Sequence, residues 1–173
     1  MSIKLTIKQR VALIFISWFS IVGFDLFLHA GLLARLYARP DPFLLSADKA
    51  FLRIPLGYLS FLILAMVLVW LMESFNISGW KSGVLFGLKF GALTWGVFVL
   101  GLYSISSAGW DLLLAWWIGQ TLELGIAGIV VGAGIAGKLL SKITVWIIVF
   151  VVLMVILTFV LQAIGFASPM KLI

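Results

Sequence analysis

The chain contains no cysteine and only one histidine among its 173 residues. The absence of cysteine excludes disulfides, thiolate catalysis, cysteine-ligated metals and iron–sulfur clusters. A single histidine also falls short of the two or three that catalytic zinc sites usually use. The sequence has no Walker loop, dinucleotide fingerprint, H-E-x-x-H or nucleophile elbow. We therefore expect a protein that is not an enzyme and that has no cofactor, and we expect it to bind lipid.

Charge is the second scarce feature. Charged residues make up 10% of the chain and hydrophobic residues 64%, with a mean hydropathy of +1.27. Soluble domains carry about 25% charged residues, so a lipid bilayer must cover this much apolar surface. The net charge of +6 comes from basic residues that mostly flank apolar runs. Because they form no stripe or cluster, nucleic acid is not expected as a partner.

The apolar runs predict an all-α, polytopic transmembrane bundle with about five spans in one domain, residues 1–173. A spanning helix needs about 20 apolar residues, and the fourth run exceeds that length. It must tilt, kink or protrude. A short amphipathic helix is expected at the membrane interface at about 46–54. The expected spans are about 11–30, 55–74, 80–103, 110–137 and 142–165.

The orientation of the bundle follows from the basic residues near the ends of the runs. The first helix usually dominates orientation, and the 104–109 connection carries no positive charge, so we expect a cytoplasmic N-terminus. The basic first loop opposes this choice. The expected inside set is Lys4, Lys8, Arg10, Lys81, Lys138 and Lys142, and the outside set is Arg35, Arg39, Lys49, Arg53 and Lys171.

Small residues recur at four-residue spacing in the third and fourth runs. Such stripes let helix backbones approach closely, which drives helix association in lipid. The motif is weakly specific, and it is compatible with packing inside the bundle or with a dimerisation face. The helix-packing residues are Gly83, Gly87 and Gly91 in one run and Gly128, Gly132 and Ala136 in the other.

Two charges lie in the interior of these runs, and intramembrane charges are the first place to look for function. Lys89 lies about 12 Å and Glu123 about 20 Å from the start of its helix, so the two could pair at similar depth. However, both point away from the glycine stripes at 100° per residue. They cannot pair if the two stripes face each other, and Lys89 could instead reach the headgroups by snorkelling.

Glu123 is the harder charge to explain, because its side chain is short and lies nearer the middle of its run. Gln120 and several small residues share its face. This face could line a water-filled crevice or a proton path, with Glu123, Gln120 and Lys89 as the candidate polar pathway. It could equally hold a protonated glutamic acid that is hydrogen-bonded inside the bundle.

A second polar group lies toward the other membrane face. Asp25 and His29 are four residues apart and share one face of the first helix, and Asp111 opens the fourth span at similar depth. These three residues could bind a divalent metal or relay a proton. In the structural alternative, Asp25 pairs with Arg53 or Arg35, and His29 donates to a backbone carbonyl.

Three blocks of the sequence resemble small uncharacterised bacterial multi-pass inner-membrane proteins. They are Asp25-Leu26-Phe27-Leu28-His29-Ala30-Gly31-Leu32-Leu33 closing at Tyr37, Gly83-Val84-Leu85-Phe86-Gly87-Leu88, and the stretch from Glu123 to Gly137. The resemblance covers residues 20–137. It implies a helical bundle and a bacterial source, with the fifth span as an addition to a four-span pattern, and it implies no activity.

Three functions fit these features. The first is a non-catalytic membrane subunit or scaffold that packs in a homo-oligomer or a larger membrane complex. The alternative is a small transporter or proton/ion-coupled carrier that uses Glu123, and a weaker alternative is metal or cofactor binding at Asp25 and His29. A hydrated cavity at Glu123 would favour transport, whereas enclosure of Glu123 by protein would favour the scaffold.

Overall fold

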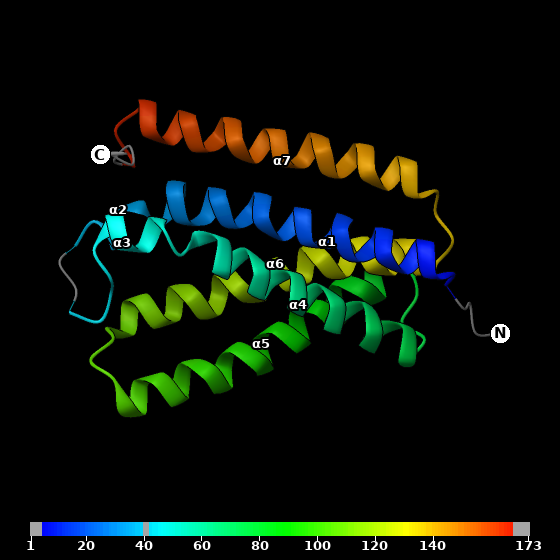
Figure 1. Ribbon diagram of the computed structural model, residues 1–173, viewed down its shortest axis with the longest axis horizontal. Helices are drawn as coiled ribbons and strands as arrows, with labels where there is room; N and C mark the ends of the chain where they lie inside the picture. Colours follow the sequence, from blue (N-terminus) through cyan, green and yellow to red (C-terminus); the bar gives the residue numbers. More distant parts are fainter. Residues whose placement is uncertain (1–4, 40–41, 168–173) are drawn as a thin grey trace.

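The computed structural model describes residues 5–39 and 42–167 and is an all-α bundle, which confirms the expected fold class. Five helices are long and apolar enough to cross a membrane. Figure 1 shows α7 and α5 at opposite edges of the bundle, with α1, α4 and α6 between them. The elements are α1 Ile7–Phe27, the π-helix η1 Leu28–Leu32, α2 Ala34–Tyr37, α3 Ala47–Phe51, α4 Ile54–Ser74, α5 Trp80–Ile105, α6 Trp110–Ile135 and α7 Leu140–Ala163.

The first helix begins four residues earlier than the apolar pattern suggests. Thr6 and Gln9 form a capping box: the Thr6 hydroxyl accepts from the Gln9 amide, and the Gln9 side chain accepts from the Thr6 amide. This reciprocal pair satisfies donors that a helix start otherwise leaves free. The helix therefore includes its basic first turns, and the first candidate span extends over Ile7–Leu32.

The fourth span ends at Ile135, two residues before the expected end, because Gly137 stops the helix. Gly137 has φ 81°, and its amide bonds the Gly134 carbonyl while the Lys138 amide bonds the Ala133 carbonyl. This pair of bonds is the Schellman motif, in which a glycine takes the left-handed conformation. The span remains one continuous helix of 26 residues.

The remaining boundaries differ by a few residues from the expected ones. The interfacial helix is reduced to α3, which closely precedes α4, and Pro55 lies in the first turn of α4. Proline is tolerated there because the first amides of a helix have no intrahelical partner. The fifth span, α7, begins at Leu140 rather than at residue 142.

The glycine stripes of α5 and α6 face each other and bring the two backbones into contact. A Cβ added at Gly83 would collide with the Gly128 carbonyl oxygen, and one at Gly87 with the Leu124 carbonyl oxygen. The Gly79 amide also donates to the Gly132 carbonyl across the helix pair, at 2.8 Å. The stripes thus pack within the bundle.

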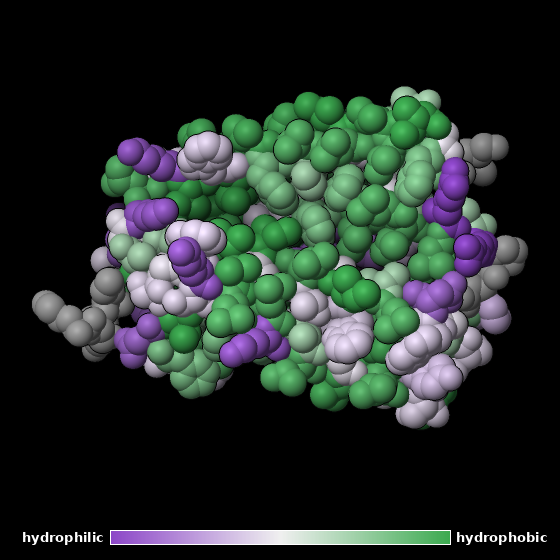
Figure 2. Space-filling view, turned by 180° about the vertical axis from the view of Figure 1, so that it is seen from behind, coloured by the Kyte–Doolittle hydropathy of each residue, from purple (hydrophilic) through white to green (hydrophobic). Residues whose placement is uncertain are grey.

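Helix α6 lies at the centre of the protein, while the outer helices present apolar side chains outward. About 72% of its apolar window is buried, against 17% for α7, which packs on α1. Figure 2 shows a broad hydrophobic surface with hydrophilic residues gathered mainly toward the two ends. This pattern is what a bilayer-spanning protein requires.

The charged residues at the ends of the bundle are partly paired. Glu73 accepts two hydrogen bonds of 2.8 Å from the Arg10 guanidinium, and its carboxylate is 17% exposed. The pair ties the start of α1 to the end of α4. Lys4 and Lys171, which the orientation count includes, lie outside the described residues.

Candidate functional site

Three ionisable side chains from two helices meet inside the bundle. Asp25 comes from the last turns of α1, His29 from η1, and Glu123 from the middle of α6. One ligand-type atom of each lies within 4.8 Å of the other two. The sequence pattern placed Glu123 in one candidate site and the Asp25–His29 pair in another, but the fold brings them together.

The backbone that carries His29 is a five-residue π-helix, Leu28–Leu32. Short π-helical turns are rare and are frequent at functional sites, because the extra residue re-aims the side chains of that turn. Small residues make the local packing possible: a Cβ at Gly119 would collide with the Leu28 side chain, and one at Gly31 would press on Leu161. Gln162 of α7 donates to the Ala30 carbonyl at 3.2 Å. Helices α6 and α7 therefore both hold η1 in place.

Asp25 and His29 interact directly. The His29 Nε2 atom lies 3.2 Å from Asp25 Oδ1, and the two side chains are 27% and 14% exposed. The expected pairing of Asp25 with Arg53 or Arg35 is wrong. Arg35 instead donates to the Gly165 carbonyl at 3.0 Å, with its guanidinium over the Phe166 ring.

Glu123 is enclosed, with a relative exposure of 1%. Its Oε1 atom accepts a hydrogen bond of 3.1 Å from the side-chain amide of Gln120, one turn earlier on α6. Its Oε2 atom is also buried, and within the described part of the chain it has no hydrogen-bond partner. A buried polar atom without a partner is costly and calls for an explanation.

Tyr37 lies against His29, and Trp116 holds its hydroxyl; the sequence pattern had assigned neither residue to the site. The Tyr37 ring lies 5.2 Å from the His29 ring, and the Tyr37 hydroxyl accepts a 2.6 Å hydrogen bond from Trp116 Nε1. Burial raises the pKa of the Tyr37 phenol, which lies beyond the first span, well above its ordinary value. The eight-residue spacing of His29 and Tyr37, about two turns, was the signal that could have placed both on one face.

Two expected members of the sites lie elsewhere. Asp111 is exposed and pairs with Arg39 at 3.2 Å, and it is 12 residues, about 18 Å of helix, before Glu123. Lys89 is exposed on α5, and the described residues contain no ion pair between it and Glu123. The reason is geometric, since the facing glycine stripes turn Lys89 outward.

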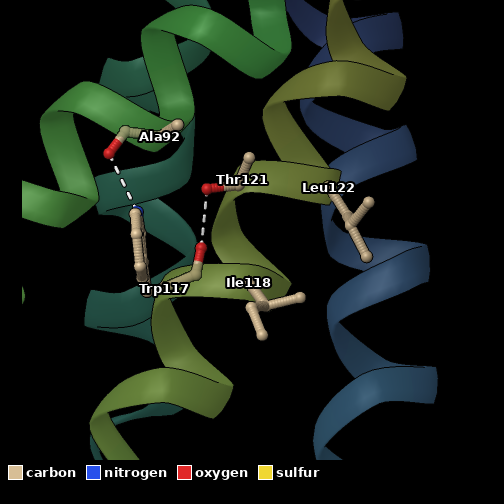
Figure 3. Close-up of a pocket in the computed structure, with 5 residues that line it drawn as sticks. All are labelled: Ala92, Trp117, Ile118, Thr121 and Leu122. Carbon is tan, nitrogen blue, oxygen red and sulfur yellow. Dashed lines mark hydrogen bonds between the residues drawn. The ribbon is translucent and has the colours of Figure 1, made fainter.

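Two pockets lie in the described part of the chain away from the Asp25–His29–Glu123 cluster, and none of the three residues lines either of them. One, of about 200 Å³, is an apolar groove lined by Ala92 on α5 and by residues of α6. Figure 3 shows its polar groups already paired: the Trp117 indole donates to the Ala92 carbonyl, and the Thr121 hydroxyl to the Trp117 carbonyl. The other, of about 280 Å³, is lined by Leu5, Gln9, Gly134, Gly137, Lys138, Leu139 and Leu140.

Comparison of the chain with protein-family models, with curated proteins and with solved structures finds no match. The chemistry of the cluster must therefore be read from its own groups. Two carboxylates and an imidazole, mostly withdrawn from water, can exchange protons or ligate a cation.

Proposed function

We propose that this protein is a non-catalytic integral membrane subunit whose bundle packs in a homo-oligomer or in a larger membrane complex. The observation that carries the proposal is the enclosure of Glu123. Its 1% exposure and its bond to Gln120 favour a packed polar centre over an open pathway. Neither described pocket includes it.

The distribution of burial supports the same function. The α5–α6 seam is built on backbone contacts that leave little freedom for the two helices to separate. Helices α4, α5 and α7 expose large apolar side chains such as Trp70, Val97 and Phe159 along their outer faces. These faces suit lipid tails or the spans of another subunit, because both offer apolar cover.

The test is to extract the full chain with its surrounding lipid and to measure the mass and composition of the particles by native mass spectrometry. We expect a defined stoichiometry of copies or of a partner. A monomer without any partner, at all protein-to-lipid ratios, would overturn the proposal.

A proton- or ion-coupled carrier is the second candidate. It is favoured by the unpartnered Oε2 of Glu123 and by the closeness of the Glu123 carboxylate to Asp25 and His29. A carrier requires an ionisable group within the membrane that changes partners during transport. Reconstitution into liposomes with a trapped pH dye tests this function. Cation-dependent proton flux that Glu123→Gln abolishes and Glu73→Gln retains would favour the carrier over the subunit.

The proposed location is the inner membrane of a bacterium, with the N-terminus in the cytoplasm. The alternation of the five helices brings the start of α1, the α4–α5 connection and the α6–α7 connection to one end of the bundle (Figure 1). Lys8, Arg10, Lys81, Lys138 and Lys142 come from these segments. The positive-inside bias favours the cytoplasm for that end.

A further inference from the structure

We propose that Asp25, His29 and Glu123 bind a divalent transition-metal ion, with zinc as the best fit. The site would fasten the end of α1 and η1 to the middle of α6, which goes beyond a packing role for the bundle. Imidazole and carboxylate are ligands that zinc accepts readily. Zinc in proteins is usually four-coordinate, so a water molecule would complete this set of three protein ligands.

The spacing of the ligand atoms fits such an ion. Zinc bonds of about 2.0–2.1 Å in a tetrahedron place neighbouring ligand atoms about 3.4 Å apart. His29 Nε2 and Asp25 Oδ1 are separated by 3.2 Å, and the Glu123 ligand atom completes a set within 4.8 Å. An ion would take the place of the hydrogen that the imidazole shares with Asp25, and the Glu123 ligand atom, within 4.8 Å of the other two, would move closer to complete the coordination.

A second observation concerns the Glu123 carboxylate within this cluster. Glu123 Oε2 is buried without a partner among the described residues, whereas Oε1 is held by Gln120. A metal ligand is typically oriented by a neighbouring hydrogen bond of this kind while its other atom binds the ion. The side chain of Gln120 therefore fits the role of orienting the Glu123 carboxylate toward the ion.

The balance of charges around the cluster also favours a bound cation. Each described arginine that pairs with an acid does so elsewhere, Arg10 with Glu73 and Arg39 with Asp111. Asp25 has the His29 imidazole beside it, and no arginine or lysine of the described residues pairs with Glu123. Two ionised carboxylates this close, and mostly withdrawn from water, would repel each other. A divalent cation would neutralise both and would supply the missing partner of Oε2.

The test uses the full chain in detergent or nanodiscs, purified with a tag that contains no histidine or cysteine and stripped with a chelator. Co²⁺ or Zn²⁺ alone is then added. Because His29 is the only histidine and the chain has no cysteine, a visible Co²⁺ spectrum with nitrogen ligation reports on this position alone. We expect one equivalent bound, a rise in the unfolding temperature, and displacement of Co²⁺ by Zn²⁺.

The variants separate this site from adventitious binding. Loss of a residue that merely orients a ligand typically weakens metal affinity 10–100-fold, so Gln120→Ala should fall in that range. Asp25→Asn, His29→Gln and Glu123→Gln should each lose at least about 100-fold. Asp111→Asn and Glu73→Gln are the matched controls and should bind as the unaltered chain does. Should Glu123→Gln fail to fold, Glu123→His keeps a ligand and should still bind.

Two results would overturn the proposal. One is a folded, unaltered chain that shows neither a Co²⁺ spectrum nor a shift in unfolding temperature. The other is metal binding that the three ligand variants reduce no more than the two control variants do.

Discussion

At the scale of single residues, several serine and threonine hydroxyls in the spans are satisfied by their own helix. The Ser17 hydroxyl donates to the Leu13 carbonyl one turn back, and the Thr158 hydroxyl does the same toward Met154. Such local bonds remove the cost of burying a hydroxyl without requiring a partner helix. Glu123 differs from these residues, because its Oε1 accepts a hydrogen bond from Gln120 while its Oε2 has no partner among the described residues. The surroundings of Glu123 are therefore the place to look for function.

Tyr37 provides a prediction at this scale. Replacing it in Tyr37→Phe removes the acceptor of the Trp116 indole N–H, and we expect a loss of about 1 kcal/mol in the free energy of unfolding. Thermal unfolding in detergent at neutral pH measures the loss. An unchanged unfolding temperature would show that this hydrogen bond does not contribute to stability.

The same tyrosine predicts a dependence on pH. Burial raises the pKa of Tyr37 above its ordinary value, which is about 10. Above pH about 10 the unfolded chain releases the Tyr37 proton, while the folded chain keeps it. The contribution of Tyr37 to stability therefore falls as the pH rises. The stability difference between the unaltered chain and Tyr37→Phe should therefore shrink above pH about 10. A difference that stays constant to higher pH would contradict this assignment.

At the scale of elements, the contact between α5 and α6 depends on the absence of side chains. Gly83, Gly87 and Gly91 are buried, and each faces α6 backbone. A hydrophobic driving force between helices is missing in lipid, so close backbone packing has to replace it.

A matched pair of substitutions on α5 tests this packing. The added methyl group in Gly87→Ala would meet the Leu124 carbonyl, and overpacking of this kind costs about 1–3 kcal/mol. A Cβ at Gly101 meets nothing within 4 Å, so Gly101→Ala should be neutral or should stabilise the helix by up to about 1 kcal/mol. The free energies of unfolding of the two variants can be compared by measuring their unfolding in mixed detergent. Equal stability of the two variants would contradict the close contact.

At the scale of the whole molecule, the five antiparallel helices fix which connections share a membrane face. The α4–α5 and α5–α6 connections lie at opposite ends of the bundle (Figure 1). The absence of cysteine makes this arrangement easy to test, because any introduced thiol is unique.

Single-cysteine variants therefore give the orientation. Under the proposed orientation, Ser107→Cys in the α5–α6 connection should react with a membrane-impermeant maleimide added to intact cells. Ser78→Cys in the α4–α5 connection should react only after the membrane is opened. Both serines are exposed, so burial does not confuse the comparison. The reverse labelling pattern would place the N-terminus outside.

The sequence by itself determined the class of protein and the approximate limits of its five long helices. Apolar runs of spanning length and the scarcity of charge leave few other solutions, because unpaired backbone groups cannot be exposed to lipid. The glycine spacing also marked the surfaces that pack. The helix ends were off by a few residues where local capping decided them, as at Thr6 and Gly137.

Only the tertiary structure decided which polar groups meet. Asp25 and His29 could be paired from their four-residue spacing, but Glu123 lies almost a hundred residues later and could join them only through the packing of α1 on α6. Glu123, and not Asp111, joins Asp25 and His29 because of how each helix is rotated about its axis. The facing glycine stripes fix that rotation, and they also place Lys89 on the outside. A sequence pattern gives the angle of each side chain around its own helix, whereas the angle between helices is set by contacts that exist only in the folded bundle.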